Sequence, residues 1–440
     1  MQTLSQLQSG ALTGAKSLTL SCGLKEFPPE IFDLADTLEI LDLSGNHLTH
    51  LPPGLERLHQ LRIAFFSSND FTEFPAVLAR CPQLEMIGFK ACQIQTIAEG
   101  AIPTNTRWLI LTDNQLTKLP ASIGHCPRLQ KLMLAGNNLT ELPAELAQCQ
   151  NLELLRISAN QLTAFPNWLF ALPRLAWLAF SGNPASFHQD KSDGLPEIPW
   201  PELTLAEELG QGASGIISKA HWLSQETGGT SKAVAVKVFK GAVTSDGLPE
   251  DEMQTCMAAG RHPHLVPVLG KLSQHPAQKQ GLVFELIPAG YSNLGGPPSY
   301  ATCTRDTFPP DTVFPLPEIK SIATAIASAT AHLHARGISH SDLYAHNTLV
   351  DEAGHALFGD FGAATLYDTS DARRASAVER LEVRAFGCLL EDLLDRLAPT
   401  EDQRAETVLA LRRLLQDCLQ PQVLRRPNFN AIIARLEELG

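Results

Sequence analysis

The 440-residue sequence lacks several features that would assign it to a particular class of protein. It has no uninterrupted apolar run of about 18 residues, so no membrane-spanning helix is expected. Its N-terminus has no long apolar core behind a basic start, so no secretory signal is expected either. Basic residues are not in excess, and the formal net charge of −13 argues against a nucleic-acid partner, because phosphate backbones attract basic surfaces.

Paired cysteines are missing as well. The nine cysteines are odd in number and scattered, and no CxxC spacing occurs among them. This usage indicates reduced thiols in a cytoplasmic compartment rather than a secreted fold held by disulfides. The sequence does contain enough hydrophobic residues, 44%, to build cores for two or three domains.

The first half of the chain repeats itself. A fragment of the form L-x-x-L-x-L-x-x-N recurs every 22 or 23 residues between Leu38 and Asn183. Its closing position is nearly always asparagine: Asn46, Asn69, Cys92, Asn114, Asn137, Asn160 and Asn183. The pattern resembles the leucine-rich-repeat family over residues 15–187, which implies a solenoid whose leucines point inward and stack from copy to copy. The asparagine amide is expected to satisfy backbone groups at each turn.

The residues that alternate with the inward leucines are expected to line the concave face of this solenoid. Several of them are large and apolar: Phe65, Trp108, Ile110, Met133 and Trp177. Such a surface is too apolar to be merely solvated. We expect it to bind a protein partner or to hold the second half of the same chain, and shielding by neighbouring strands is the alternative.

The repeat pattern stops after Asn183. Residues 188–202 are rich in proline and polar side chains, which is typical of a linker. From 203 to 440, β-branched runs followed by longer helical stretches indicate a second domain.

A glycine-rich loop opens this second domain. Gly210, Gly212 and Gly215 form G-x-G-x-x-G, a weak signal by itself because dinucleotide-binding domains contain the same string. Here the loop continues into a β-branched run instead of a helix, and a second such run carries Lys237. These flanks indicate a strand pair folded over a phosphate-bearing ligand. Glycines are needed there because backbone amides can approach the phosphate oxygens only where no Cβ intervenes.

Two further motifs follow in order. His340, Asp342 and Asn347 form H-x-D-x-x-x-x-N, and residues 360–362 read D-F-G. The ordered set is similar to that of the protein-kinase family over the whole second domain. The resemblance implies a bilobal α+β domain, and for the whole chain an α/β multidomain fold in which a leucine-rich-repeat solenoid comes first.

The resemblance also implies chemical roles and the cofactors ATP and Mg²⁺. Asp342 would accept the proton of the attacking hydroxyl, while Asn347 and Asp360 would hold Mg²⁺. Lys237 would bind the α- and β-phosphates. The chemistry needs these residue types because the transferring phosphoryl group carries several negative charges that metals and a lysine must neutralise.

The remaining ATP-binding residues follow from the same resemblance. Lys237 would pair with a helix carboxylate, for which Glu252 is favoured over Glu250 and Asp251. The phosphates would meet the three glycines of the loop. The adenine would lie among residues that include Phe284 as the gatekeeper: Ile217, Ala235, Phe284, Glu285, Ile287 and Leu349.

The sequence departs from the family pattern at several positions. Ser341 stands where the family commonly has an arginine that binds the phosphate of a phosphorylated activation loop. Because serine cannot do so, activity is expected not to depend on such phosphorylation. Tyr344 replaces a cation that helps the transferring phosphate, so transfer is expected to be slow. His346 would partly substitute for that cation if protonated, or is a solvated loop histidine. The segment that follows Gly362 is short and contains no A-P-E, which removes much of a peptide-binding platform.

Three functional interpretations result. The favoured one is an ATP- and Mg²⁺-dependent protein kinase, with serine or threonine favoured over tyrosine as acceptor, and with a protein-binding repeat domain. The second is a nucleotide-binding, pseudokinase-like scaffold. The third is a small-molecule phosphotransferase. The loop without a cation and the short segment without A-P-E resemble those of the small-molecule kinases of this fold.

Overall fold

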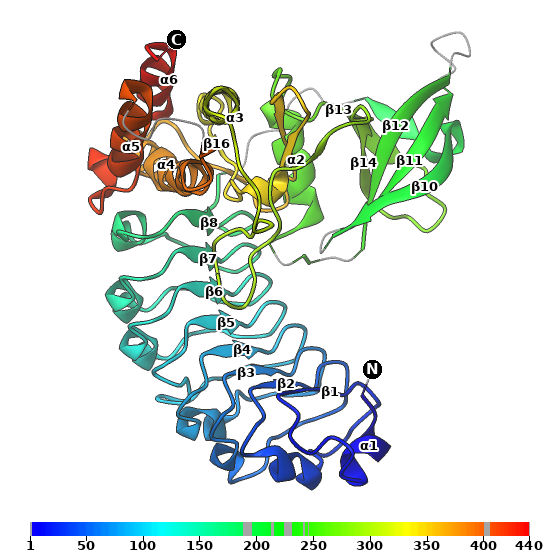
Figure 1. The fold of residues 1–440 in the computed structure, drawn as a ribbon. Helices are drawn as coiled ribbons and strands as arrows, with labels where there is room; N and C mark the ends of the chain where they lie inside the picture. The colour runs from blue at the N-terminus through cyan, green and yellow to red at the C-terminus, as the bar shows by residue number, and fades with distance from the viewer. Residues whose placement is uncertain are drawn as a thin grey trace. The chain divides into compact units, whose positions relative to one another are not determined.

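The computed structural model describes residues 2–187, 196–212, 215–223, 231–240, 243–244, 246–399 and 405–439 (Figure 1). The chain forms two compact units. The first contains Met1–Leu175 and Asn183–Ala185, and the second contains Ala176–Gly182 and Ser186–Gly440. No helix in the described ranges is both long and apolar enough to cross a bilayer.

The first unit begins with a short helix, α1 (Leu4–Gln8), and continues as a stack of parallel strands (Figure 1). The strands pair in chain order with matching register, so that Ile40 lies beside Ile63 and Ile63 beside Met86. Their bounds are β1 (Ser17–Thr19), β2 (Ile40–Asp42), β3 (Ile63–Phe65), β4 (Met86–Gly88), β5 (Trp108–Ile110), β6 (Lys131–Met133) and β7 (Leu154–Arg156). An eighth strand of this sheet, β8 (Trp177–Ala179), is grouped with the second unit.

Most repeats return through a 3₁₀ turn that follows a proline. Proline fixes φ near −65°, which suits the entry to a helical turn. Pro28, Pro75, Pro120, Pro143 and Pro166 each occupy the N-cap position of such a turn. The turns are Pro29–Leu34, Leu55–Arg57, Ala76–Arg80, Ala121–His125, Ala144–Gln148 and Asn167–Ala171.

The repeat asparagines act as the sequence predicts. The Oδ1 of Asn46 accepts from the backbone N–H of Cys22 and Leu24, at 3.0 and 2.9 Å, and its Nδ2 donates to the carbonyls of Leu20 and Leu43, both at 2.8 Å. The amide thereby satisfies backbone groups that a bend in the chain leaves without strand partners. In the copy that lacks asparagine, the Sγ of Cys92 reaches the carbonyl of Phe66 at 3.4 Å.

The second unit opens with a mostly antiparallel sheet in the order β10-β11-β12-β14-β13-β9. Its strands are β9 (Glu197–Pro199), β10 (Leu203–Gln211), β11 (Gly215–Leu223), β12 (Ser231–Phe239), β13 (Val268–Ser273) and β14 (Gly281–Glu285). One helix, α2 (Pro249–Ala259), accompanies them. The predicted linker, 188–202, therefore ends in structured chain, because β9 pairs in parallel with β13 and Ile198 is fully buried in the core of the sheet. Residues 188–195 lie outside the described residues.

The remainder of the second unit is mainly helical. Its helices are α3 (Leu316–His334), α4 (Ala372–Leu394), α5 (Glu406–Cys418) and α6 (Phe429–Glu437). Small strands hold the loops beside them: β15 (Ser292–Asn293), β16 (Ile338–Ser339), β17 (Thr348–Val350), β18 (Ala356–Phe358) and β19 (Thr365–Leu366). The apolar stripe of α3 is buried at helical spacing, at Ile319, Ile322, Ile326 and Leu333. The expected fold class is confirmed: a parallel leucine-rich-repeat sheet is followed by a domain with one six-stranded sheet, two small sheets and a set of helices.

Candidate active site

A buried lysine connects three elements of the second unit. The Nζ of Lys237, on β12, lies 2.6 Å from Oε1 of Glu252 on α2 and 3.4 Å from Oδ1 of Asp360, which follows β18. Of the three acidic residues that the sequence offered, Glu252 makes this contact. Gly260 ends the helix at φ +66°, a left-handed value that suits glycine.

The electrostatics of this cluster favour a charged lysine. Burial by itself would lower the pKa of Lys237, but the carboxylates of Asp360 and Glu252 outweigh it and raise that pKa. Burial raises the pKa of Glu252 to about 7, against the attraction of Lys237. Partial desolvation also acts to raise the pKa of Asp360, yet Lys237 and the N–H of Gly362 lower it overall. The cluster therefore presents one cation and one ionised, half-exposed carboxylate, Asp360.

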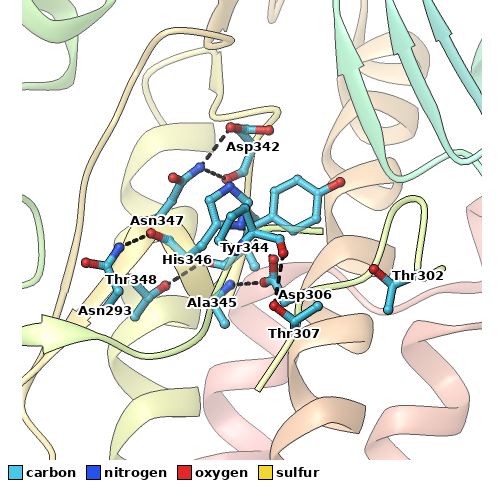
Figure 2. A network of polar contacts seen from close by, with 12 residues as sticks. Asn293, Thr302, Asp306, Thr307, Asp342, Tyr344, Ala345, His346, Asn347 and Thr348 are labelled. Carbon is cyan, nitrogen blue, oxygen red and sulfur yellow. Dashed lines mark hydrogen bonds and ion pairs between the residues drawn. The ribbon is translucent and has the colours of Figure 1, made fainter. Parts of the chain in front are cut away.

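Asp342 and Asn347 are held together by the fold of their loop (Figure 2). The Nδ2 of Asn347 donates to Oδ2 of Asp342 at 2.8 Å and to its backbone carbonyl at 3.0 Å. Both amide hydrogens thus point to Asp342, and the amide oxygen is the atom of Asn347 that suits a cation. Asp360 has φ +58°, uncommon for a residue with a side chain, and such conformations cluster at functional sites.

A buried glutamate on α4 anchors the start of the same loop. Glu382 accepts hydrogen bonds from the backbone N–H of Ser341 at 2.6 Å and of His340 at 3.1 Å. Its carboxylate also lies 2.8 Å from Nε2 of His334. Burial acts to raise the pKa of Glu382, but these partners outweigh it and lower the pKa. No chemical role was predicted for Glu382, although residues 382–387 resemble the D-x-W-S-x-G helix of the protein-kinase family, with Glu382 at the position of the aspartate.

The left-handed backbone of Ser341, at φ +64°, belongs to this anchor. The residue is 1% exposed, and its hydroxyl donates to the hydroxyl of Ser339 at 3.1 Å. Ser341 is thus enclosed beside Glu382. Nearby, the ring of His340 is stacked on Phe358 with centroids 3.8 Å apart and lies 5.0 Å from Phe361, as expected for a packed histidine.

Asp306 fixes the second half of the loop, and no motif pointed to it. Its Oδ2 accepts from the N–H of Ala345 at 2.5 Å, and its Oδ1 lies 2.6 Å from Nδ1 of His346 (Figure 2). Asn293 donates to the carbonyl of His346 from the other side. Burial acts to lower the pKa of His346, but the hydrogen bond and charge of Asp306 outweigh it and raise the pKa. His346 is therefore a paired, partly buried imidazole rather than a solvated one.

Tyr344 is enclosed, with 4% exposure, and does not reach into open solvent. Its ring stacks on Trp177 with centroids 4.5 Å apart and planes 5° apart. Trp177, itself 2% exposed, belongs to the same compact unit as Tyr344. Of the two roles that the sequence left open for Trp177, contact with the second half of its own chain is the one observed. Phe65, Trp108, Ile110 and Met133 are half-buried.

The glycines of the loop differ in what they allow. A Cβ on Gly215 would lie 2.7 Å from the carbonyl oxygen of Val238, so only glycine fits beside β12. A Cβ on Gly210 or Gly212 would meet no atom within 4 Å, which leaves their backbone open to a ligand. The N–H of Gly212 donates to the carbonyl of Gly215 at 3.0 Å, closing the turn. Residues 213 and 214 lie outside the described residues.

The predicted adenine residues come from several strands. Ile217 on β11 lies opposite Lys237, and Ala235 on β12 lies opposite Phe284 on β14. Glu285 ends β14 and donates its N–H to the carbonyl of Pro267 at 2.9 Å. Ile287 follows this strand and is half-buried, and Leu349 lies on β17. The contacts of these residues with adenine stay a prediction.

The residues present fit a magnesium–nucleotide complex. The Asn347 amide oxygen and the Asp360 carboxylate are the hard oxygen donors that Mg²⁺ prefers, and protein sites usually complete its shell with substrate phosphates. In the described ranges no group of three or more His, Cys, Asp or Glu side chains is gathered as an all-protein metal centre would require. The Asn347 amide oxygen and the Asp360 carboxylate are the groups that would hold such an ion.

Comparison with known families agrees with this arrangement. Residues 203–387 match the family described as protein tyrosine and serine/threonine kinase. Residues 104–162 and 127–184 match one leucine rich repeat family, and residues 37–58 match another. The chain carries leucine-rich repeats N-terminal to a protein-kinase domain.

Similar curated proteins include some named as serine/threonine-protein kinases and one named as a tyrosine-protein kinase receptor, TYRO3 of Mus musculus, which is 28% identical over 202 residues, covering 46% of the chain and 22% of that protein. The chain is 22% identical over 249 residues to a probable cyclin-dependent serine/threonine-protein kinase of Dictyostelium discoideum, covering 52% of the chain and 36% of that protein. It is 24% identical over 295 residues to fibroblast growth factor receptor 1 of Xenopus laevis, covering 56% and 36%. It is 29% identical over 187 residues to the serine/threonine-protein kinase grp of Drosophila melanogaster, covering 42% and 32%. The chain spans 22% to 36% of the length of these relatives.

Proposed function

We propose that this chain is an ATP- and Mg²⁺-dependent protein kinase, with serine or threonine favoured over tyrosine as the acceptor. One observation carries the proposal: the buried Lys237 contacts both Glu252 and Asp360, at 2.6 and 3.4 Å. A lysine held between a helix carboxylate and a half-exposed carboxylate suits an anionic ligand such as a triphosphate. The resemblance assigns the same residues to that task.

Each residue then has a chemical role. Lys237 neutralises the α- and β-phosphates, and Glu252 keeps its ammonium in place. Asn347 and Asp360 hold Mg²⁺, which offsets the charge of the transferring phosphoryl group when the nucleotide is bound. Asp342 orients the acceptor hydroxyl and takes its proton, and the Asn347 amide fixes the carboxylate at 2.8 Å for this purpose.

His346 supplies the positive charge that Tyr344 does not. The Tyr344 ring is neutral and covered by Trp177, whereas the Asp306 carboxylate favours the protonated form of His346. An imidazolium in this loop would stabilise negative charge that develops on the phosphoryl oxygens. Because a histidine holds its proton less firmly than lysine or arginine, we expect transfer that is slow and sensitive to pH.

Incubation of the pure chain with labelled ATP and Mg²⁺, with or without a general protein substrate, tests this function. We expect label on protein from the wild type and none from Asp342→Ala. An Asp342→Ala chain that still binds ATP shows that its fold is intact. Tight ATP binding by the wild type without any transfer would instead support a pseudokinase-like scaffold.

A small-molecule phosphotransferase is the second candidate, favoured by one specific observation. Strand β19 ends at Leu366 and α4 begins at Ala372, so few residues are available for a peptide-binding platform. Supplying free aminoglycosides or choline beside the protein substrate distinguishes the two. Label that moves to the small molecule and not to protein would favour this candidate.

The repeat domain is proposed to bind a protein partner through the half-buried residues of its strands, Phe65, Trp108, Ile110 and Met133. Lys131 lies with its Nζ 4.2 Å from the Trp108 ring centroid, a contact that adds a charge to this apolar set. A cytoplasmic location is proposed on the cysteine usage. Loss of partner capture in Trp108→Ala with unchanged thermal stability would support the binding face, and unchanged capture would contradict it.

A further inference from the structure

The kinase-like unit includes a piece of chain from the end of the repeats. Residues Ala176–Gly182 are here called the anchor segment. In the sequence they precede the kinase domain, which was predicted to begin at residue 203. By their contacts they belong to the same compact unit as the loop that carries Asp342. The protein-kinase match begins at residue 203, whereas a leucine rich repeat match, 127–184, covers this segment.

The first contact of the anchor segment is with the loop that carries Asp342, residues 339–347, here called the catalytic loop. The Nε1 of Trp177 donates to the backbone carbonyl of Leu343 at 3.0 Å, and its ring stacks on Tyr344. Both loop residues are almost fully buried, with exposures of 1% and 4%. They directly follow Asp342 in the chain. Trp177 thereby fixes a carbonyl and a ring within two residues of the proposed base.

The second contact is with the segment after the D-F-G motif. The backbone N–H of Phe180 donates to Oγ1 of Thr365 at 3.2 Å, and Thr365 is fully buried on β19. β19 pairs with β16, with Ser339 opposite Thr365, immediately before His340. The Phe180 carbonyl is itself held by the hydroxyl of Ser186 at 2.6 Å. The anchor segment thus contacts residues that follow Asp342 directly, and it is linked to the residues before Asp342 through the pairing of β19 with β16.

Side chains of α4 complete the enclosure. Ala385 and Leu389 border the same small cavity as Trp177 and Tyr344. The catalytic loop is therefore held on one side by Glu382 and on another by Trp177. Trp177→Phe would keep an aromatic ring against Tyr344 but would remove the donor to the Leu343 carbonyl, so this variant separates the two contributions.

We propose that Trp177 is a positioning residue for phosphoryl transfer: it fixes Leu343 and Tyr344 and so sets the orientation of Asp342. The inference rests on the proposed function. A small displacement of a base costs rate rather than nucleotide affinity, because the phosphates are bound by other residues.

The test compares full-length wild type, Trp177→Phe and Trp177→Ala, with Trp168→Phe as the matched control in a repeat turn of the first unit. Two readouts are taken: hydrogen exchange of the amides in 339–347, and kcat with KM for ATP. We expect Trp177→Ala to exchange about 10-fold faster in this loop and to lose about 10- to 100-fold in kcat, with KM changed less than about twofold. Trp177→Phe should fall between Trp177→Ala and the wild type, and the control should match the wild type.

The two claims fail separately. If the wild type transfers no phosphate, the proposed function fails, and the exchange of 339–347 in Trp177→Ala still decides whether the loop is held by this residue. Exchange in 339–347 that is unchanged in a folded Trp177→Ala chain overturns the proposal. A parallel loss of kcat and ATP binding, with faster exchange throughout the second unit, also overturns it, since that pattern denotes general destabilisation.

Discussion

The Nζ of Lys237 lies 2.6 Å from Oε1 of Glu252, and the two side chains are only 6% and 2% exposed. Such a pair is costly to break from one side, because the remaining charge stays buried. The pair also ties β12 to α2 and, through the 3.4 Å contact with Asp360, to the loop after β18. If Lys237 binds the nucleotide as proposed, nucleotide binding and the stability of this unit are linked through this one lysine.

Replacing Glu252 by alanine should lower the free energy of unfolding by about 3 kcal/mol, since Lys237 loses its nearest carboxylate in a buried place. Lys237→Met should cost less stability, because Glu252 can take up a proton, but should weaken ATP binding at least about tenfold. Chemical denaturation and calorimetric titration measure the two effects. Lys271→Met, which breaks the exposed pair with Glu197, is the control and should cost less than about 1 kcal/mol.

The His346–Asp306 pair predicts a pH dependence. Because Asp306 raises the pKa of His346 in the folded chain, the stabilisation is fully present below the ordinary value of 6.5 and is lost as pH rises through the folded-state pKa. The stability difference between the wild type and His346→Gln should therefore shrink from pH 6 to pH 9. The phosphoryl-transfer rate should fall over the same rise in pH, and less so in the variant.

Denaturation curves at several pH values check this prediction. The matched control is His355→Gln, because His355 forms an exposed pair with Asp351 at 2.9 Å that should contribute little. A wild-type advantage over His346→Gln that stays constant across the range would show that this imidazole does not change its charge there.

Glu382→Gln should disrupt the catalytic loop although it preserves side-chain size. The amide would replace a carboxylate that accepts from the N–H groups of Ser341 and His340, so we expect a loss of about 2–3 kcal/mol in unfolding free energy. Hydrogen exchange at Ser341 should rise with it. The same substitution at the exposed Glu437 on α6 should be neutral, and an equally stable Glu382→Gln chain would contradict the anchoring role.

Phosphatase treatment should leave activity unchanged. Thr365 and Tyr367, the hydroxyl residues nearest the D-F-G motif, are 0% and 5% exposed, and the Tyr367 hydroxyl is bonded to Nδ1 of His334 at 2.9 Å. Ser341 cannot offer a charge to a phosphate. Transfer rates before and after treatment check this, and a chain silenced by phosphatase would show that a phosphorylated form is the active one.

Periodicity and motif order predicted much of this molecule, because both are local properties of the sequence. The repeat spacing defined the strands, and the shared register of asparagines predicted the amide contacts that Asn46 makes. The sequence favoured Glu252 over Glu250 and Asp251, but only the contact with Lys237 separates it from these two neighbours. Local sequence patterns thus identify secondary-structure elements more reliably than they identify which side chains contact each other.

Other features depend on contacts between distant residues and left no local signal. Asp306 lies in a proline- and glycine-rich stretch without a motif, yet it holds Ala345 and His346. β9 forms within a segment whose prolines indicated a linker, because a parallel edge position beside β13 tolerates them. By the repeat pattern, Trp177 is one of the large apolar residues expected on the concave face. Only its contacts with Leu343 and Tyr344 distinguish it from the other residues of that set.

The most direct test of this account is the affinity of the intact chain for ATP measured with and without Mg²⁺, in the wild type and in Asp360→Asn. The account predicts that Mg²⁺ strengthens binding to the wild type and that most of this gain disappears in the variant. Equal affinity with and without the ion in both chains would contradict the convergence of Lys237, Asp360 and Asn347 on one magnesium-bound triphosphate.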